Sequence, residues 1–317
     1  MKPQRFIACL LAAATCAATV AAAQMTVEDT SRATEWTVKY QGRKLMVYSF
    51  APDKFKPYVK ELCTFDGENL LRDAPHDHLH HHALMYAIRV NGINFWEETP
   101  GSGVQKPVVT GKPEISTAQD GSPQARIRQT VHWIAAQDAF LPDTGKLALL
   151  VEERTLTLTV NPESKEVALQ WKSDFVLGGK TNEVTLAGAN YFGLGMRFQQ
   201  ELDPVAVHVF AGGKPDLSEN RQDVSKHPWE AVTFDRPGKP ATVVLFGHPA
   251  NARGDAAYFS MRTPFAYLSA TQELYKEPLV YRGQDRFQLN YLVALYPRLK
   301  SPEDITQRGQ LWSKAQP

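Results

Sequence analysis

Hydrophobic and polar residues alternate in short runs over most of this chain. In the run "EERTLTLTVNPESKEVALQW", threonines occupy one side and apolar residues occupy the other: Leu156, Leu158 and Val160. The pair Asn161-Pro162 is a turn signal, and the apolar side resumes with Val167 beyond it. An alternation of period two is typical of half-buried strands, so this stretch predicts an antiparallel hairpin.

The same alternation recurs along the chain, at residues 36–50, 125–136, 231–247 and 286–297. Many short strands separated by turn signals predict an all-β protein, a large antiparallel β-sandwich. Two segments rich in Gly, Pro, Ser, Asp and Lys, at 112–124 and 212–227, are expected to be surface loops.

One helix is predicted, in the C-terminal stretch "SPEDITQRGQLWSK". Ser301 can cap it, Pro302 suits the first helical position, and Asp304 completes a weak capping box. We find no internal repeat and no composition shift that would mark a domain boundary. Residues 24–317 are therefore expected to form a single β-sandwich domain with one C-terminal helix.

The first 23 residues have the features of a signal peptide. Lys2 and Arg5 make a basic start, an apolar run begins at Phe6, and small residues stand at Ala21 and Ala23 before the expected cleavage. Beyond this segment no apolar run approaches the roughly 20 residues of a membrane helix. We expect an exported protein, periplasmic or secreted, with no membrane span.

Composition narrows the possible functions. Removing Lys2 and Arg5 from the 35 Lys and Arg leaves 33 bases against 34 acids, without the basic excess of a nucleic-acid-binding protein. After the leader only Cys63 remains of the three cysteines, which excludes an internal disulfide and a thiolate metal site. The expected partner is a small-molecule or oligosaccharide ligand.

The run "PHDHLHHHALMYAIRVNGINFWEE" begins at Pro75 and holds five histidines in seven positions, 76–82. In an extended segment His81 would point away from the other four. A His-x-His pair such as His78 and His80 can bind a divalent metal with a carboxylate from elsewhere. Alternatively, His80 or His81 is an acid–base catalyst, or the histidines form a solvated loop in which His76 and His82 are peripheral.

Aromatic residues beside acids and imidazoles suggest a carbohydrate site. "INFWEE" provides Trp96 with Glu97 and Glu98, and "TVHWIAA" provides His132 beside Trp133. Rings can stack on the C–H face of a sugar while the carboxylates transfer protons. Both tryptophans could equally be core residues of strands.

Two further stretches carry candidate ligand-binding residues. "LFGHPANARGDAAYFSMRTPF" contains candidates that suit a polyhydroxyl or carboxylate ligand, or that only hold a turn: His248, Asn251, Arg253 and Arg262. In "NYFGLGMRF", Gly193 and Gly195 permit close backbone approach, and Arg197 could point into a cleft. No third glycine and no helix follow, so a nucleotide cofactor is not expected.

These motifs, in this order, resemble the bacterial family labelled methane oxygenase PmoA-like, a family of unknown function, over nearly the whole chain after the leader. The resemblance points to the positions His78, His80, His81, Asn91, Gly92, Phe95, Trp96, Gly195, Arg197, His248, Pro249, Asn251 and Arg253. The chain departs from the family pattern at His82, at Leu79 and at residues 88–90. The resemblance implies work on carbohydrates without fixing the reaction.

Together the residues and the resemblance predict an exported carbohydrate-active enzyme. His80 or His81 would be the acid–base group, Glu97 or Glu98 a second proton-transfer group, and Arg197, Arg253 and Arg262 anchors for ligand oxygens. Elimination, hydrolysis and epimerisation stay open. The alternative is a noncatalytic periplasmic protein that binds a sugar or a metal.

Overall fold

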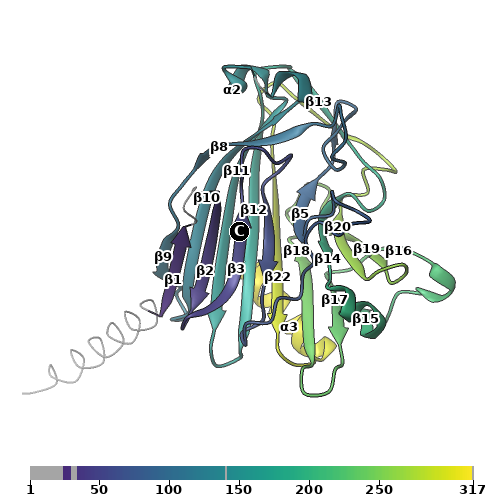
Figure 1. Cartoon of the computed structure of the whole chain (residues 1–317). Coiled ribbons are helices and arrows are strands. Elements are labelled where there is room, and N and C mark those ends of the chain that lie inside the picture. The colour runs from purple at the N-terminus through teal and green to yellow at the C-terminus, as the bar shows by residue number, and fades with distance from the viewer. Residues whose placement is uncertain (1–23, 30–33, 140, 316–317) are drawn as a thin grey trace, which may run out of the picture.

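The structure, a computed structural model, describes residues 24–29, 34–139 and 141–315 (Figure 1). The predicted signal peptide, residues 1–23, lies outside them. Two nine-stranded antiparallel sheets and a small four-stranded sheet account for the strands in this part of the chain. The prediction of a large antiparallel β-sandwich with a C-terminal helix is confirmed.

The first sheet contains most of the N-terminal strands and four strands from the second half of the chain. Its order is β1 (Met25–Asp29), β2 (Glu35–Tyr40), β3 (Arg43–Ser49), β4 (Tyr58–Leu62), β5 (Leu84–Ala87), β14 (Gly193–Arg197), β20 (Tyr267–Thr271), β19 (Ala257–Met261) and β16 (Asp223–Lys226).

The second sheet packs against the inner face of the first. Its order is β15 (Ala206–Phe210), β17 (Trp229–Phe234), β18 (Ala241–Gly247), β22 (Arg286–Tyr296), β12 (Glu166–Leu177), β11 (Leu150–Asn161), β10 (Pro123–Ile134) and β8 (Val104–Thr110), and β9 (Glu114–Thr117) pairs with β10. The small sheet is β21 (Leu279–Arg282), β13 (Glu183–Ala187), β6 (Arg89–Val90) and β7 (Ile93–Asn94).

The predicted hairpin is formed by β11 and β12. Leu156 faces Trp171 and Val160 faces Val167 in the register, and β11 ends at Asn161, where the turn was expected. Leu156, Leu158 and Val160 are fully buried. The period-two alternation therefore put its apolar side into the space between the two sheets, as in aligned sheet packing.

The C-terminal helix α3 (Pro302–Ala315) begins where the capping residues predicted. The Asp304 backbone N–H donates to Ser301 Oγ at 3.1 Å. Ile305 and Trp312 are buried in a second apolar cluster on the outer face of the second sheet, with Trp229 and Phe246. The helix thus covers apolar side chains that β17 and β18 turn away from the main core.

Some elements were not predicted. A one-turn helix, α2 (Thr144–Leu147), precedes β11, and three short 3₁₀ segments occur: η1 (Ala136–Asp138), η2 (Gln200–Val205) and η3 (Ser218–Asn220). The loops expected at 112–124 and 212–227 contain β9 and β16, so that expectation was partly wrong. Both are four-residue edge strands without the apolar alternation that a half-buried strand shows.

A buried ion pair lies within the sandwich core. Glu152 and Arg154 on β11 have completely buried side chains, and Arg154 Nε donates to Glu152 Oε1 at 2.7 Å. Trp133 Nε1 and Ser173 Oγ also donate to this carboxylate, at 2.8 and 2.5 Å. Arg154 Nη2 donates to Gln105 Oε1 at 3.0 Å. The pair is stabilised because its remaining donors and acceptors find partners.

Cys63 is buried beside β4 and is the one cysteine among the residues that the structure describes. Burial raises the pKa of its thiol to about 12. In the same part of the chain no helix has the length and apolar character needed to cross a membrane.

The register of the first sheet separates an inner face from an outer face. Leu194 and Leu268 point inward, whereas Arg197, opposite Tyr267 on β20, points to the outer face. Two aromatic residues from connecting segments lie over this outer face. The ring centroid of Trp96 is 6.5 Å from that of Tyr267, and the ring centroid of Tyr191 is 5.9 Å from that of Phe259. The candidate site forms between that face and these segments.

Candidate functional site

The histidine-rich segment is not extended. Two successive turns form, because the His78 N–H donates to the Pro75 carbonyl and the His81 N–H donates to the His78 carbonyl, both at 2.9 Å. The expectation that His81 points away from its neighbours was therefore wrong. The ring centroids of His78 and His81 are 4.6 Å apart, and those of His80 and His81 are 4.5 Å apart.

These three imidazoles line one side of a cavity of about 300 Å³. This volume lies at the lower end of the range for small-molecule sites. The remaining lining comes from Glu97, from the outer face of the first sheet and from the loops above it: Tyr191, Gln222, Phe259, Met261, Phe265 and Tyr267. The lining thus combines ionisable groups with aromatic rings, and His78 and His81 contact Phe265 directly, with ring centroids 5.2 and 5.8 Å from its ring.

His80 and Glu97 form the exposed polar pair of the cavity. His80 Nε2 lies 3.3 Å from Glu97 Oε2, and both side chains keep partial access to solvent. Desolvation lowers the pKa of His80, and the opposing charge of Glu97 does not fully offset it. A neutral imidazole beside a carboxylate can pass a proton in either direction once a ligand supplies the second partner.

His81 lies deeper, below His78 and His80. Burial, followed by repulsion from the other two histidines and from Arg197, lowers its pKa from the ordinary 6.5 to about 3. Among the described residues its Nδ1 atom is buried and has no hydrogen-bond partner. A neutral imidazole with a free ring nitrogen can accept a proton or donate a hydrogen bond, depending on its tautomer.

His82 is not peripheral, contrary to expectation. It is buried, with Nδ1 2.7 Å from Asp73 Oδ1 and Nε2 3.0 Å from Glu98 Oε1. Its ring stacks on Tyr58 at 3.8 Å. Desolvation opposes the charged imidazole, but the bonds to Asp73 and Glu98 outweigh it and raise the pKa of His82.

Glu98 was predicted as a proton-transfer group but does not line the cavity. Lys56, almost completely buried, donates to Glu98 Oε1 at 2.6 Å and to the Trp96 carbonyl at 3.1 Å. Desolvation would raise the pKa of Glu98, but His82 and Lys56 together lower it to about 2. The structure gives Glu98 a supporting position and leaves Glu97 as the carboxylate of the cavity.

Gly195 allows the aromatic floor of the cavity to form. A β-carbon added there would lie 1.8 Å from Tyr267 Oη and 3.2 Å from the Trp96 ring. The predicted close approach at this glycine is confirmed, and its partner is an aromatic side chain. Tyr267 and Trp96 could not both keep their places above a larger residue.

We expect Gly195→Ala to destabilise the protein by about 1–3 kcal/mol, because the added methyl group must displace the ring of Tyr267. Chemical denaturation measures this loss. Gly213→Ala is the control, because its backbone is not in the left-handed region and a β-carbon there makes only ordinary contacts, 3.4 and 3.5 Å from the Phe210 ring. Equal losses at the two glycines would contradict the packing argument.

A metal site is not preformed. Among the residues that the structure describes, no three side chains of His, Cys, Asp or Glu are arranged to hold an ion together. The assignment of a metal to His78 and His80 therefore stays a prediction that lacks a third ligand here.

Comparison with known proteins shows the family. The model of a family of unknown function, DUF6807, matches residues 35–309. The chain belongs to this family. The DUF6807 description names no activity, and no curated protein matches the chain.

Solved structures similar to this DUF6807 chain include larger sugar-processing enzymes. The GH36 α-galactosidase AgaB from Geobacillus stearothermophilus superposes with a TM-score of 0.50 at 12% identity, over 86% of this chain and 41% of the enzyme. The α-galactosidase from Lactobacillus brevis gives 0.46 at 9% identity, over 86% and 39%. A galactose mutarotase related enzyme from Lactobacillus acidophilus gives 0.33 at 9%, over 87% and 100%. The likeness to AgaB shows a shared fold, and this chain spans less than half of that enzyme.

The predicted ligand-binding residues of the 245–265 stretch do not line the histidine cavity. Asn251 clamps the backbone of Asn290, because its Oδ1 accepts from the Asn290 N–H at 2.6 Å and its Nδ2 donates to the Asn290 carbonyl at 3.0 Å. His248 is buried against Trp312, with ring centroids 5.4 Å apart. In the DUF6807 fold these two residues join the end of β18 to β22.

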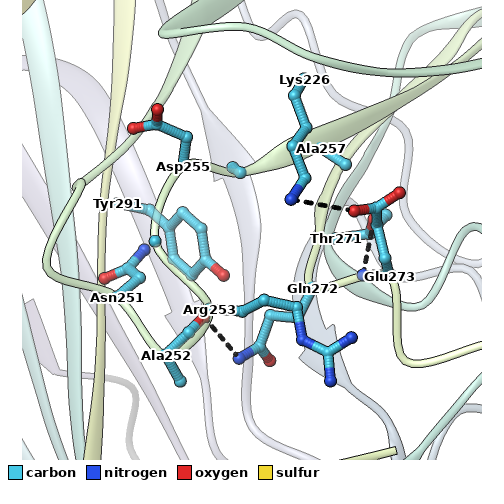
Figure 2. A pocket seen from close by; sticks show the side chains of 12 residues that line it. Lys226, Asn251, Ala252, Arg253, Asp255, Ala257, Thr271, Gln272, Glu273 and Tyr291 are labelled. Carbon is cyan, nitrogen blue, oxygen red and sulfur yellow. Dashed lines mark hydrogen bonds and ion pairs between the residues drawn. The ribbon is translucent and has the colours of Figure 1, made fainter. Parts of the chain in front are cut away.

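Arg253 lies beside a separate, very small cavity, of about 10 Å³, at the other end of β19 and β20 (Figure 2). Such a volume holds about one water molecule. Arg253 Nη2 donates to the Glu277 carbonyl at 2.7 Å, and neighbouring Lys226 lies 3.1 Å from Glu273 Oε2. Arg253 thus holds the 277–278 turn in this DUF6807 chain. On its other side Arg253 borders an open groove of about 580 Å³ along residues 276–280, which is separate from the histidine cavity.

Two more predicted residues also lie elsewhere. His132 is on β10 of the second sheet, with Nδ1 2.9 Å from Thr144 Oγ1. Arg262 is exposed in the segment between β19 and β20 and does not line the histidine cavity. Trp96 is fully buried, stacked on Phe192 at 4.9 Å, so it forms the support behind the cavity of this DUF6807 chain.

Sequence reasoning missed the aromatic wall of the cavity. Its members stand inside quoted motifs, since Tyr191 precedes Gly193 and Phe259 and Phe265 flank Arg262. The signal that could have found them is the outward register of β19 and β20, which needs the strand pairing and not the sequence alone.

Proposed function

We propose that this DUF6807 protein is an exported carbohydrate-active enzyme that uses acid–base chemistry on a sugar or glycoside-derived ligand. One observation carries the proposal. Three imidazoles and Glu97 share with aromatic rings the lining of one cavity of about 300 Å³, which is large enough for one sugar residue. The aromatic rings can stack on the C–H face of a pyranose, while the proton-transfer groups beside them reach its oxygen atoms.

The roles follow from burial and charge. His81 is held neutral by its low pKa, and its unpartnered Nδ1 is suited to a hydrogen bond with the ligand. His80 and Glu97, 3.3 Å apart, are suited to take a proton from the ligand and to give it back on the solvent side. Elimination, hydrolysis and epimerisation each need one acid and one base, and this pair of groups supplies both.

The shared fold agrees with a sugar ligand. AgaB, whose fold this chain shares, is an α-galactosidase. Its similarity to our chain extends over less than half of its length, so its substrate is a guide to the class of compound and not to the reaction.

A screen of neutral and acidic hexoses and their methyl glycosides tests the proposal. Saturation-transfer NMR detects binding, and one-dimensional spectra after long incubation detect cleavage, a new double bond or an epimer. We expect at least one compound to bind and to be converted. Binding without conversion would support the noncatalytic sugar-binding alternative, and no binding at all would remove both.

Export is tested separately. We expect the protein from the periplasm or the medium to begin at Gln24, as measured by intact-mass spectrometry. An intact N-terminus on cytosolic protein would contradict it.

The low pKa of His81 predicts how stability depends on pH. Its folded value, about 3, lies below the ordinary 6.5, so the unfolded chain binds more protons between these values. Stability is therefore present above pH 6.5 and is lost as the pH falls toward 3, by at most about 1.4 kcal/mol per pH unit from this group. Denaturation midpoints from pH 7 to 3.5 measure the slope. His81→Asn should flatten it, and an unchanged slope in that variant would contradict the assignment.

A further inference from the structure

Arg197 is a buried cation directly behind the cavity lining, covered by the ring of Phe265. It points to the outer face of the first sheet, directly opposite Tyr267 of the cavity lining. Its side chain is only 2% exposed. Its guanidinium lies over the ring of Phe265, with Cζ 3.2 Å from the ring centroid. A buried arginine normally has a carboxylate and a full set of hydrogen bonds.

Arg197 has only part of this set. Within the described part of the chain, Nε and Nη1 are buried without a hydrogen-bond partner. The nearest carboxylate, Asp77, lies 3.6 Å from Nη2, beyond good hydrogen-bond distance, and is 41% exposed. Asp203, another nearby acid, accepts the Ala266 N–H at 2.8 Å. The positive charge is therefore weakly neutralised, although it is out of water.

The cavity consequently has two unlike ends. At one end the carboxylate of Glu97 stands beside His80. At the other end the cation of Arg197 lies under Phe265, close enough to His81 to help lower its pKa. A ligand with an anionic group would place that group at the Arg197 end, because the Glu97 end would repel it.

We propose that the natural ligand is a sugar acid whose carboxylate binds Arg197 and displaces the long contact with Asp77. This inference rests on the proposed function, since it names the class of sugar that the same cavity takes. A carboxylate supplies acceptors for the unpartnered N–H groups and neutralises the buried charge, as charge-assisted bonds to arginine do in other sites. Phe265, which follows the exposed residues 262–264, moves aside to admit it.

The test compares sugars that differ only at C6. Isothermal titration calorimetry measures the affinity for each member of three pairs: glucose and glucuronate, galactose and galacturonate, and mannose and mannuronate. Glucose 6-phosphate is measured as an anion of a different kind. We expect the acid of at least one pair to bind tenfold or more tightly than its neutral partner. Arg197→Gln should remove most of this preference and change the affinity for the neutral sugar less than threefold. Arg262→Gln, an exposed arginine nearby, is the matched control and should change neither.

A second variant protects the test if Arg197→Gln does not fold. Asp77→Asn removes the competing carboxylate from a partly exposed position and should tighten binding of the acid by severalfold. Equal binding of acid and neutral sugar, a preference that survives Arg197→Gln, or tighter binding of glucose 6-phosphate than of glucuronate would each overturn the inference and leave the proposed function standing. Failure of every sugar to bind would instead overturn the proposed function.

Discussion

Replacing His80 and His81 together by alanine is expected to lower kcat/KM for the converted sugar by about 10²–10⁴-fold. Both rings line the cavity, and no other imidazole among the described residues lies on this lining except His78. The loss would come from proton transfer at His80, which is paired with Glu97, and from the hydrogen bond that the unpartnered Nδ1 of His81 can make to the ligand. Steady-state kinetics on the compound found in the screen measures it.

His76→Ala is the control for this variant. His76 belongs to the same segment but is exposed and does not line the cavity, so its removal should leave kcat/KM within about twofold. Undiminished turnover by the double variant, in protein with an unchanged denaturation midpoint, would refute the catalytic assignment of both histidines.

Replacing Glu152 by leucine is expected to cost about 3–5 kcal/mol of stability. The change leaves the guanidinium of Arg154 completely buried without its carboxylate, and it also removes the acceptor of Trp133 and Ser173. Urea denaturation of the purified variant measures the loss.

The companion variant carries Glu152→Leu with Arg154→Met. Removing both charges should recover a large share of the stability, because the cost arises from a lone buried charge and not from the missing pair. Equal losses in the single and double variants would show that packing at these positions, and not charge, sets the stability.

The sequence predicted the fold well where strands are half-buried. The alternation of β11 and the Ser301 cap of α3 act locally, so they can be recognised without knowing the partners. The strands β9 and β16 were not predicted, because a short strand at the edge of a sheet needs no apolar face and so shows no alternation in the sequence.

The candidate site was predictable only in part. His80, His81 and Glu97 line one cavity, and Arg197 lies beside it under Phe265. Their arrangement depends on two turns that fold the histidines together, which no alternation pattern reports. The sequence also predicted ligand binding by His248, Asn251 and Arg253, which lie outside the cavity. It could not separate the two roles, because the same polar side chains can either hold a backbone segment or bind a ligand.

The state of Cys63 makes this protein suitable for site-selective labelling. Its thiol is buried and, with a pKa of about 12, carries almost no thiolate at neutral pH, so it should resist alkylating dyes. Leu79, flanked by two cavity histidines, is 65% exposed. A fluorophore attached through Leu79→Cys would sit beside the cavity and report ligand occupancy. We expect its emission to change on titration with the bound sugar, and a dye on Val109→Cys of β8 should not respond.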